Sequence, residues 1–218
     1  MIPLKMKFPL TLTAMLFLLA SLAFLPGCKV GDDDPGISFR SRDARLKANW
    51  KMRSMQNVVE INNQVAGGVA TRTQILSDFD GYNIRIKTFV NSLQVSDSSF
   101  GFNYQMMLKD NGKVGYENTV IIFSLGTKSA GDDNWYWINT DQKKARVYLG
   151  SALQYAATVG VPMQTNISLP FSTLLTDFTV EGLRNRELKL SYQKNTSQVT
   201  LAGFQQVSIS SKFVFDSK

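Results

Sequence analysis

The chain has 218 residues, 44% of them hydrophobic, and carries 24 lysine and arginine residues against 17 aspartate and glutamate residues. It contains no histidine and one cysteine, which excludes Ser-His-Asp and Cys-His catalysis, histidine-ligated metals, thiolate zinc clusters and an internal disulfide. The positive excess is moderate and no dense basic block follows residue 53, so we expect no nucleic-acid partner.

The N-terminal 27 residues have the layout of a bacterial lipoprotein signal peptide. Two lysines precede an almost wholly apolar run, Phe8–Phe24, and Leu25-Pro26-Gly27-Cys28 follows directly. The alternatives are a plain secretory signal and a membrane-spanning anchor, but the run has 17 residues where a span needs about 20. The sequence therefore predicts cleavage before Cys28 and acylation of that cysteine, so that its acyl chains hold the mature protein on a membrane.

Residues 28–42 are expected to form a flexible tether between the membrane and a folded domain at 43–218. The segment Lys29–Gly36 is short, polar and rich in residues that break regular structure. Its acidic cluster, Asp32–Asp34, resembles a retention or surface-export signal of Gram-negative lipoproteins, and a solvated linker explains it equally well. The expected location is the bacterial envelope, with the outer membrane favoured and exposure at the cell surface left open.

The first half of the domain has the two-residue periodicity of β-strands from Trp50 onward. Apolar side chains alternate with polar ones over 82–90, and the alternation is stronger over 100–108. Asn111-Gly112 then predicts a tight type I′ hairpin turn, because both residues tolerate positive φ. Residues 113–124 are expected to run back antiparallel, although the run at 120–123 is too uniformly apolar to show which face is buried.

The second half of the domain continues in the same way. Further strands are expected at 134–138, 146–149, 178–180, 188–192, 199–201 and 207–215. Sustained helical spacing is absent from the mature sequence, apart from a weak possibility at 151–159. Eight or more strands in succession predict an all-β, up-and-down antiparallel meander, and closing it into a barrel would remove the exposed edges of an open sheet.

Several short motifs occur in a recognisable order: Asp34-Pro35, Ser38, Arg40-Ser41-Arg42, Arg45-Leu46, Trp50-Lys51, Asp80-Gly81, Lys109-Asp110-Asn111-Gly112, Trp135 with Trp137, Lys143-Lys144, and Leu188, Leu190 and Tyr192. Together they cover most of residues 34–192, and following a lipidated cysteine they resemble small lipocalin-like lipoproteins of Gram-negative bacteria. The resemblance implies a lipocalin-like barrel with Trp50 packed across its closed end.

The sequence departs from the lipocalin pattern at that end. Lipocalins usually have Gly-x-Trp, whereas this chain has Ala48-Asn49-Trp50, and the late arginine that usually stacks on the tryptophan is missing from residues 195–218. Arg42 or Arg45 is therefore expected to cover Trp50 by a cation–π contact. The alternative is that Trp50 is simply a core aromatic residue.

The interior of such a barrel is either filled by side chains or holds one small ligand. The candidate ligand contacts on strands are Tyr104, Trp135 and Trp137, with both tryptophans expected inside. Residues 150–176 form a long, weakly charged connection, which is either a lid that brings its apolar residues to a ligand or a pair of extra strands packed on the barrel. The candidate contacts in this connection are Leu153, Tyr155 and Met163. For any single aromatic residue, a packed core is the more common role.

No group of residues indicates catalysis or metal binding. The segment Asp78–Gly81 resembles the opening of a calcium loop, but Tyr82 follows and no glutamate closes the pattern, so a turn is expected. The glutamates form no convergent pair for glycosidic chemistry. We therefore expect a non-enzymatic protein without a cofactor. Two functions remain: a membrane-anchored carrier of a small hydrophobic ligand or lipid, and a scaffold lipoprotein with a filled barrel whose loops bind another envelope protein.

Overall fold

The computed structural model describes residues 41–218, apart from 66, 139–144, 154–155, 157–176 and 201–202. The signal peptide, Cys28 and two candidate ligand residues, Tyr155 and Met163, lie outside the described residues. The elements are α2 (Arg42–Leu46), β1 (Asn49–Val65), β2 (Thr71–Phe79), β3 (Asn83–Val90), β4 (Leu93–Leu108), β5 (Lys113–Ile122), β6 (Leu125–Asn134), β7 (Tyr136–Ile138), β8 (Arg146–Tyr148), β9 (Asp177–Leu183), β10 (Glu187–Thr200) and β11 (Gly203–Ser217).

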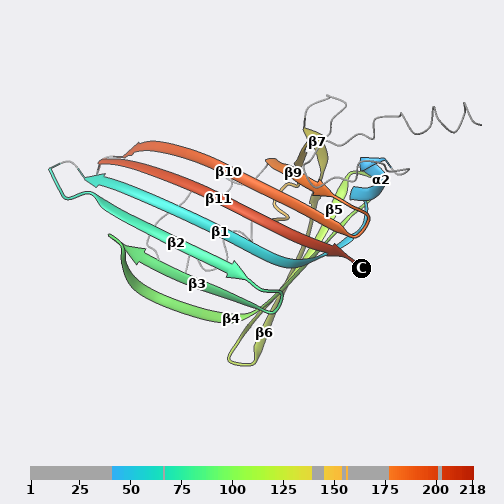
Figure 1. The fold of residues 1–218 in the computed structure, drawn as a ribbon, viewed down its shortest axis with the longest axis horizontal. Coiled ribbons are helices and arrows are strands. Elements are labelled where there is room, and N and C mark those ends of the chain that lie inside the picture. Colours follow the sequence, from blue (N-terminus) through green and yellow to red (C-terminus); the bar gives the residue numbers. More distant parts are fainter. Residues whose placement is uncertain (1–40, 66, 139–144, 154–155, 157–176, 201–202) are drawn as a thin grey trace, which may run out of the picture.

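The strands form a single antiparallel sheet in the order β6-β5-β4-β3-β2-β1-β11-β10-β9-β8-β7 (Figure 1). The first and last strands, β1 and β11, pair from Trp50↔Ser217 to Val65↔Gly203. Strands β6 and β7 are consecutive in the chain, yet they form the two edges of the sheet and do not pair within the described residues. The predicted all-β antiparallel meander is thus confirmed, whereas its closure into a complete barrel is not.

Strand β4 makes the sheet curl because it changes partners halfway along its length. Its first half pairs with β3 up to Gly101, and its second half pairs with β5. In that second half, Gln105–Met107 also pairs with Asn49–Lys51 at the start of β1. The β2–β3 hairpin therefore fills a wedge between β1 and β4, and β5 and β6 run steeply across the long strands (Figure 1).

The core lies on one face of this curled sheet, which we call the inner face. Alternate residues along each long strand point to it, as the pattern in β1 illustrates with Met55, Val59 and Ile61 buried. Burying a side chain of this size contributes roughly 1.5–3 kcal/mol. The predicted alternation over 100–108 is confirmed, since Phe102, Tyr104, Met106 and Leu108 are buried.

The turns differ in type from the one that the sequence predicts. At the β4–β5 hairpin Gly112 has a φ of 72°, but Asn111 does not have positive φ. The Gly112 N–H donates to the Lys109 carbonyl at 3.3 Å, so a three-residue loop with one left-handed glycine replaces the expected type I′ turn. Pairs of left-handed residues occur instead at Asn91-Ser92 and Phe123-Ser124.

A short helix, α2, precedes the first strand and was not expected from the sequence. Its N-cap is Ser41, whose Oγ accepts a hydrogen bond from the Ala44 N–H at 3.2 Å. Arg42, Arg45 and Leu46 are buried. The prediction that the tether extends to Arg42 is therefore wrong, because Arg42 belongs to the packed structure.

Candidate functional site

The candidate site is the inner face of the sheet, because it is where the structure gathers the aromatic side chains. Phe79 and Phe102 meet edge to face with ring centroids 5.4 Å apart. Phe178 packs similarly on Phe213 at 5.9 Å, and Phe213 stacks on Phe215 at 6.4 Å. These rings cover the half of the inner face that is nearer to α2.

A row of polar side chains crosses the middle of the inner face. The strand register aligns Tyr192 of β10 with Ser211 of β11, Ser211 with Asn57 of β1, and Asn57 with Ser77 of β2. We call these four residues the polar row. Each of them is at most 6% exposed, so the row is enclosed within a largely apolar layer.

The hydrogen bonding of the polar row is incomplete. The Ser211 hydroxyl donates to Asn57 Oδ1 at 2.7 Å. The Ser77 hydroxyl and the Tyr192 hydroxyl have no hydrogen-bond partner among the described residues. A buried polar group without a partner costs about 1–3 kcal/mol. Burial, with a smaller contribution from the charge of Asp177, raises the pKa of Tyr192 to about 12, so its phenol is a neutral donor at physiological pH.

The sequence pattern does not predict the polar row, because serine and asparagine occupy positions where the alternation would place apolar residues. Ser77 lies between Ile75 and Phe79 on the same face of β2. Ser211 lies in the same way between Ile209 and Phe213 on β11. The parity of these apolar neighbours is the signal that could have placed the serines inside.

Tyr104, a predicted ligand contact, lies fully buried on β4. Its hydroxyl donates to the Ala152 carbonyl, and burial raises its pKa well above the ordinary value. Asn118 is its register neighbour on β5, and neither amide atom of Asn118 has a partner among the described residues. Tyr104 therefore acts as a structural contact to the segment after Gly150, and Asn118 is a second unsatisfied polar point on the inner face.

The strand expected at 134–138 is divided, since Asn134 ends β6, Trp135 lies between the strands, and β7 begins at Tyr136. Trp135 and Trp137 lie on the core side, as their parity predicts, while Tyr136 is exposed. The Trp135 indole donates to the Lys109 carbonyl at 2.9 Å. The Trp137 indole donates to Asp43 Oδ1, and the Arg42 guanidinium lies 5.8 Å from the Trp137 ring. Both tryptophans thus join β7 to the rest of the fold.

The expected cation–π contact forms on a different tryptophan from the predicted one. Arg42 covers Trp137, while Arg45 donates to the Leu183 carbonyl at the end of β9. Trp50 is fully buried, and its indole donates to the Leu46 carbonyl at 2.8 Å. Trp50 is therefore a core aromatic residue that is hydrogen-bonded to α2. Arg42 connects α2 to β7 through Trp137, and Arg45 connects it to the end of β9.

Leu153, the remaining described ligand candidate, is buried beside Ala152. Asp133 of β6 holds this segment, since its Oδ2 accepts from the Ser151 N–H at 2.7 Å and from the Ser151 hydroxyl at 2.8 Å. The remainder of the long connection to Asp177, with Tyr155 and Met163, lies outside the described residues except for Ala156.

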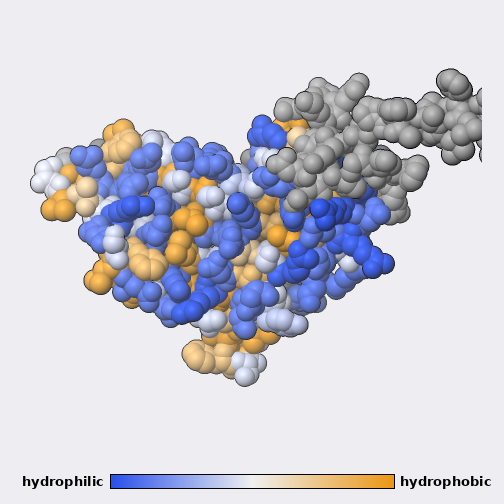
Figure 2. Space-filling view, viewed as in Figure 1, coloured by the Kyte–Doolittle hydropathy of each residue, from blue (hydrophilic) through white to orange (hydrophobic). Residues whose placement is uncertain are grey.

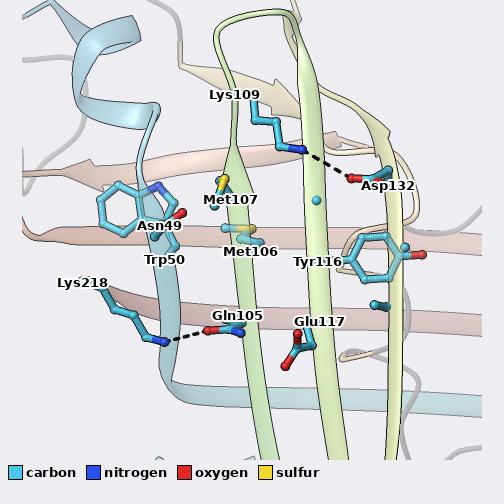
Figure 3. Close-up of a pocket in the computed structure, with 13 residues that line it drawn as sticks. Asn49, Trp50, Gln105, Met106, Met107, Lys109, Tyr116, Glu117, Asp132 and Lys218 are labelled. Carbon is cyan, nitrogen blue, oxygen red and sulfur yellow. Dashed lines mark hydrogen bonds and ion pairs between the residues drawn. The ribbon is translucent and has the colours of Figure 1, made fainter.

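A groove on the outer face, about 500 Å³ in volume, lies between the start of β1 and strands β4, β5 and β6 (Figure 3). Lys109 Nζ lies 3.8 Å from Asp132 Oδ1 across it, and Lys218 Nζ donates to Gln105 Oε1 at 2.7 Å. These charged groups are exposed and their contacts are weak. None of the predicted ligand residues that the structure describes, Tyr104, Trp135, Trp137 and Leu153, lines this groove.

The segment Asp78–Gly81, which resembles the opening of a calcium loop, forms the predicted turn. Asp80 Oδ1 accepts hydrogen bonds from the N–H groups of Tyr82 and Asn83 at 2.9 and 2.8 Å.

Within the described ranges, no cluster of three or more acidic or cysteine side chains could hold a metal ion. In the same part of the chain, no helix has the length and hydrophobicity to cross a membrane. No known protein-family model matches the sequence, and no curated protein is significantly similar to it.

Proposed function

We propose that the protein is a membrane-anchored, lipocalin-like lipoprotein of the bacterial envelope that carries a small apolar ligand or a lipid. The observation that supports this proposal most is the form of the sheet. Its inner face is broad, curved and lined by aromatic and aliphatic side chains, and the sheet is unpaired between β6 and β7 within the described residues.

The charge distribution also supports an apolar ligand. The charged residues that are buried in the described part of the chain are Arg42 and Arg45, both on α2. The other buried polar residues are neutral. A hydrocarbon chain would therefore meet an environment that resembles a protein core, where each buried CH₂ contributes about 0.8 kcal/mol.

The anchor is proposed on Cys28 and places the carrier at the outer membrane. Two or three acyl chains give stable attachment, whereas a single chain binds only marginally. The acidic tether would let the domain move relative to the bilayer while remaining attached. The protein would then act by binding and release, without an enzymatic step or a cofactor.

A scaffold lipoprotein is the second candidate, and exposed apolar residues at the hairpin ends favour it. Phe123 is 96% exposed at the tip of the β5–β6 hairpin, and Val69 and Val199 are each 85% exposed at the far ends of the long strands. Figure 2 shows hydrophobic residues at the outer end of the long strands and at the lower tip of the molecule. Such residues could bind another envelope protein.

Native mass spectrometry separates the two functions. The acylated protein would be extracted from its own membranes and compared with a mature chain that carries Cys28→Ser. We expect a discrete noncovalent mass on the folded domain that is additional to the acyl groups. A bare domain in both samples, or a domain bound only to another polypeptide, would reject the carrier and favour the scaffold.

A further inference from the structure

Strand β6 is a long and regular edge of the sheet. It has 10 residues, contains no proline, and pairs with β5 without a shift of register. No described strand lies beyond it (Figure 1), and most of its residues are exposed. The other edge, β7, has only three residues. Sheet edges are commonly protected from pairing with another chain by shortness, bulges, prolines or charges, and of these β6 has charged side chains alone.

The backbone hydrogen bonds of β6 determine which of its groups face the free edge. The two-residue turn at 123–124 is flanked by Ile122 and Leu125, and the residues that flank such a turn form a hydrogen-bonded pair. Every second pair along the two strands is bonded in the same way, and the Trp135 N–H, which donates to the Gly112 carbonyl at 2.8 Å, continues the series. The odd-numbered residues of β6 therefore bond to β5. The N–H and carbonyl groups that point to the free edge are those of Gly126, Lys128, Ala130 and Asp132.

The charged side chains of β6 are arranged symmetrically about Ala130. Lys128 and Asp132 lie on either side of it and on the same face of the strand. If two copies of β6 paired antiparallel about a two-fold axis at Ala130, each Lys128 would lie directly opposite Asp132 of the second copy. An axis at Lys128 or at Asp132 would set like charges against each other. An axis at Ser129 or at Gly131 would set each lysine against an uncharged residue.

The neighbouring strands extend this charge complementarity. Lys128 Nζ lies 2.9 Å from Glu117 Oε1 on β5. Asp132 Oδ1 lies 3.8 Å from Nζ of Lys109, which follows β4. In the paired arrangement the charges would alternate in sign across the outer face, in the order Lys109, Asp132, Lys128 of the second copy and Glu117 of the second copy. The two-fold symmetry forms this series twice, and a network of charges contributes more than an isolated surface pair.

We propose that two copies of this chain dimerise by pairing their β6 strands antiparallel about Ala130, which joins the two sheets into one. The paired segment in each copy is Gly126–Asn134, which is shorter than the about 20–30 residues that each side of a standard interface provides. The dimer is therefore expected to dissociate on dilution and to form where the chain is concentrated. The inference does not depend on the proposed ligand, so its failure would leave the carrier function standing.

Cysteine cross-linking tests the register of the pairing. In the proposed dimer the two copies of Ala130 face each other with Cβ atoms about 4.5–5.5 Å apart, whereas the two copies of Gly126 are about 26 Å apart along the strands. Residues 28–218 with Cys28→Ser contain no other thiol. We expect a short bismaleimide to convert Ala130→Cys to a covalent dimer and to leave Gly126→Cys, its matched control, monomeric. No dimer from Ala130→Cys, or as much dimer from Gly126→Cys, would overturn the inference.

Exchanging the two charges tests the contact between Lys128 and Asp132. Lys128→Asp alone sets carboxylates opposite each other, and Asp132→Lys alone sets ammonium groups opposite each other. In sedimentation equilibrium we expect each single variant to raise the dimer dissociation constant by about tenfold or more, and the double variant to restore it to within about threefold. Lys212→Asp, at an exposed position on β11, is the control and should leave the constant unchanged. A parent protein that sediments only as a monomer, or a double variant as weak as the single ones, would contradict the proposed dimer.

Discussion

Asp133 links the edge of the sheet to the segment that continues from β8. Its carboxylate accepts hydrogen bonds from the N–H and the hydroxyl of Ser151 and from the N–H of Asn134 at 2.7 Å. The carbonyl of Ala152, the next residue along the chain, accepts a hydrogen bond from the hydroxyl of Tyr104. One carboxylate therefore positions the buried pair Ala152 and Leu153 against the inner face.

Replacing this carboxylate tests its contribution and its pH dependence. Burial acts to raise the pKa of Asp133, but the hydrogen bonds from Ser151 and Asn134 and the charge of Lys113 outweigh it and lower the pKa below the ordinary 3.8. The stabilisation is therefore complete above the unfolded pKa and is lost as the pH falls through the folded pKa. We expect Asp133→Asn to lose about 1–2 kcal/mol at pH 7 in urea unfolding.

Urea unfolding of both proteins at lower pH tests whether the charge of Asp133 is responsible. The difference between Asp133→Asn and the parent protein should shrink as the pH falls below about 4. A difference that stays constant between pH 7 and pH 3 would mean that the carboxylate charge contributes nothing to the link with Ser151.

Residue contacts were only partly predictable from the sequence. The parity of the strand placed Tyr104 and Trp135 inside, because alternation fixes the face of the sheet. It could not assign Arg42 to Trp137, because that contact depends on how α2 packs against β7, across 95 residues of sequence. It also gave no indication that the hydroxyls of Ser77 and Tyr192 would lack partners.

The β5–β6 hairpin ends in a two-residue turn whose residues both have left-handed φ, 49° for Phe123 and 66° for Ser124. This conformation costs roughly 1–2 kcal/mol for residues with a side chain. We expect the double substitution Phe123→Asn with Ser124→Gly to stabilise the protein by about 1 kcal/mol and raise its Tm by about 2–4 °C. An unchanged or lowered Tm would show that exposed Phe123 contributes stability through a contact of its own.

Two glycines on β6 provide a matched pair for testing how that strand packs. A Cβ on Gly131 would lie 2.5 Å from the Tyr116 hydroxyl oxygen, whereas a Cβ on Gly126 would meet only Thr119, at 3.9 Å. We expect Gly131→Ala to lower the free energy of unfolding by about 1–3 kcal/mol. Gly126→Ala should change it by less than about 0.5 kcal/mol. Equal effects would show that the Tyr116 ring moves aside freely.

The elements with alternating sequence were predictable and those without it were not. Strand β3, the second half of β4 and the first part of β10 follow the expected pattern because their inner faces are buried. The separate strand expected at 199–201 is wrong, because Val199 lies near the end of β10 and is 85% exposed. Strand β6 has no apolar alternation, since it lies at the edge and nearly all its residues are exposed. Helix α2 has five residues, too few to give a periodic signal.

At the scale of the whole molecule, β1 is the centre of the sheet. It pairs with β11, β2 and β4, and its inner side chains are buried along most of its length. Among the described strands, β6 pairs with β5 alone, and its residues are mostly exposed. We expect the amides of β1 to exchange with solvent only through global unfolding and those of β6 through local opening.

Hydrogen exchange followed by mass spectrometry measures this difference directly. Peptides from β1 should show an opening free energy equal to the one obtained from urea unfolding, and peptides from β6 a clearly smaller one. Equal protection of both strands would mean that β6 is covered by another part of the protein or by a second molecule.

The order of strands was predictable because consecutive antiparallel strands usually lie side by side. The lack of pairing between β6 and β7 was not predictable from the sequence. Strands β7 and β8 are too short to give a clear alternation, and β6 is polar and exposed. The expectation of closure came from the general cost of free edges, which charged and polar side chains on β6 reduce in this protein.

The pairing of β1 with β11 has a consequence for how the protein is made. A growing polypeptide emerges with β1 first, and β1 lacks one of its two long neighbours until the last 16 residues, from Gly203 onward, have been synthesised. The long pairing between β1 and β11 therefore forms only after every other strand has been synthesised, and β1 can pair with β2 and β4 before that.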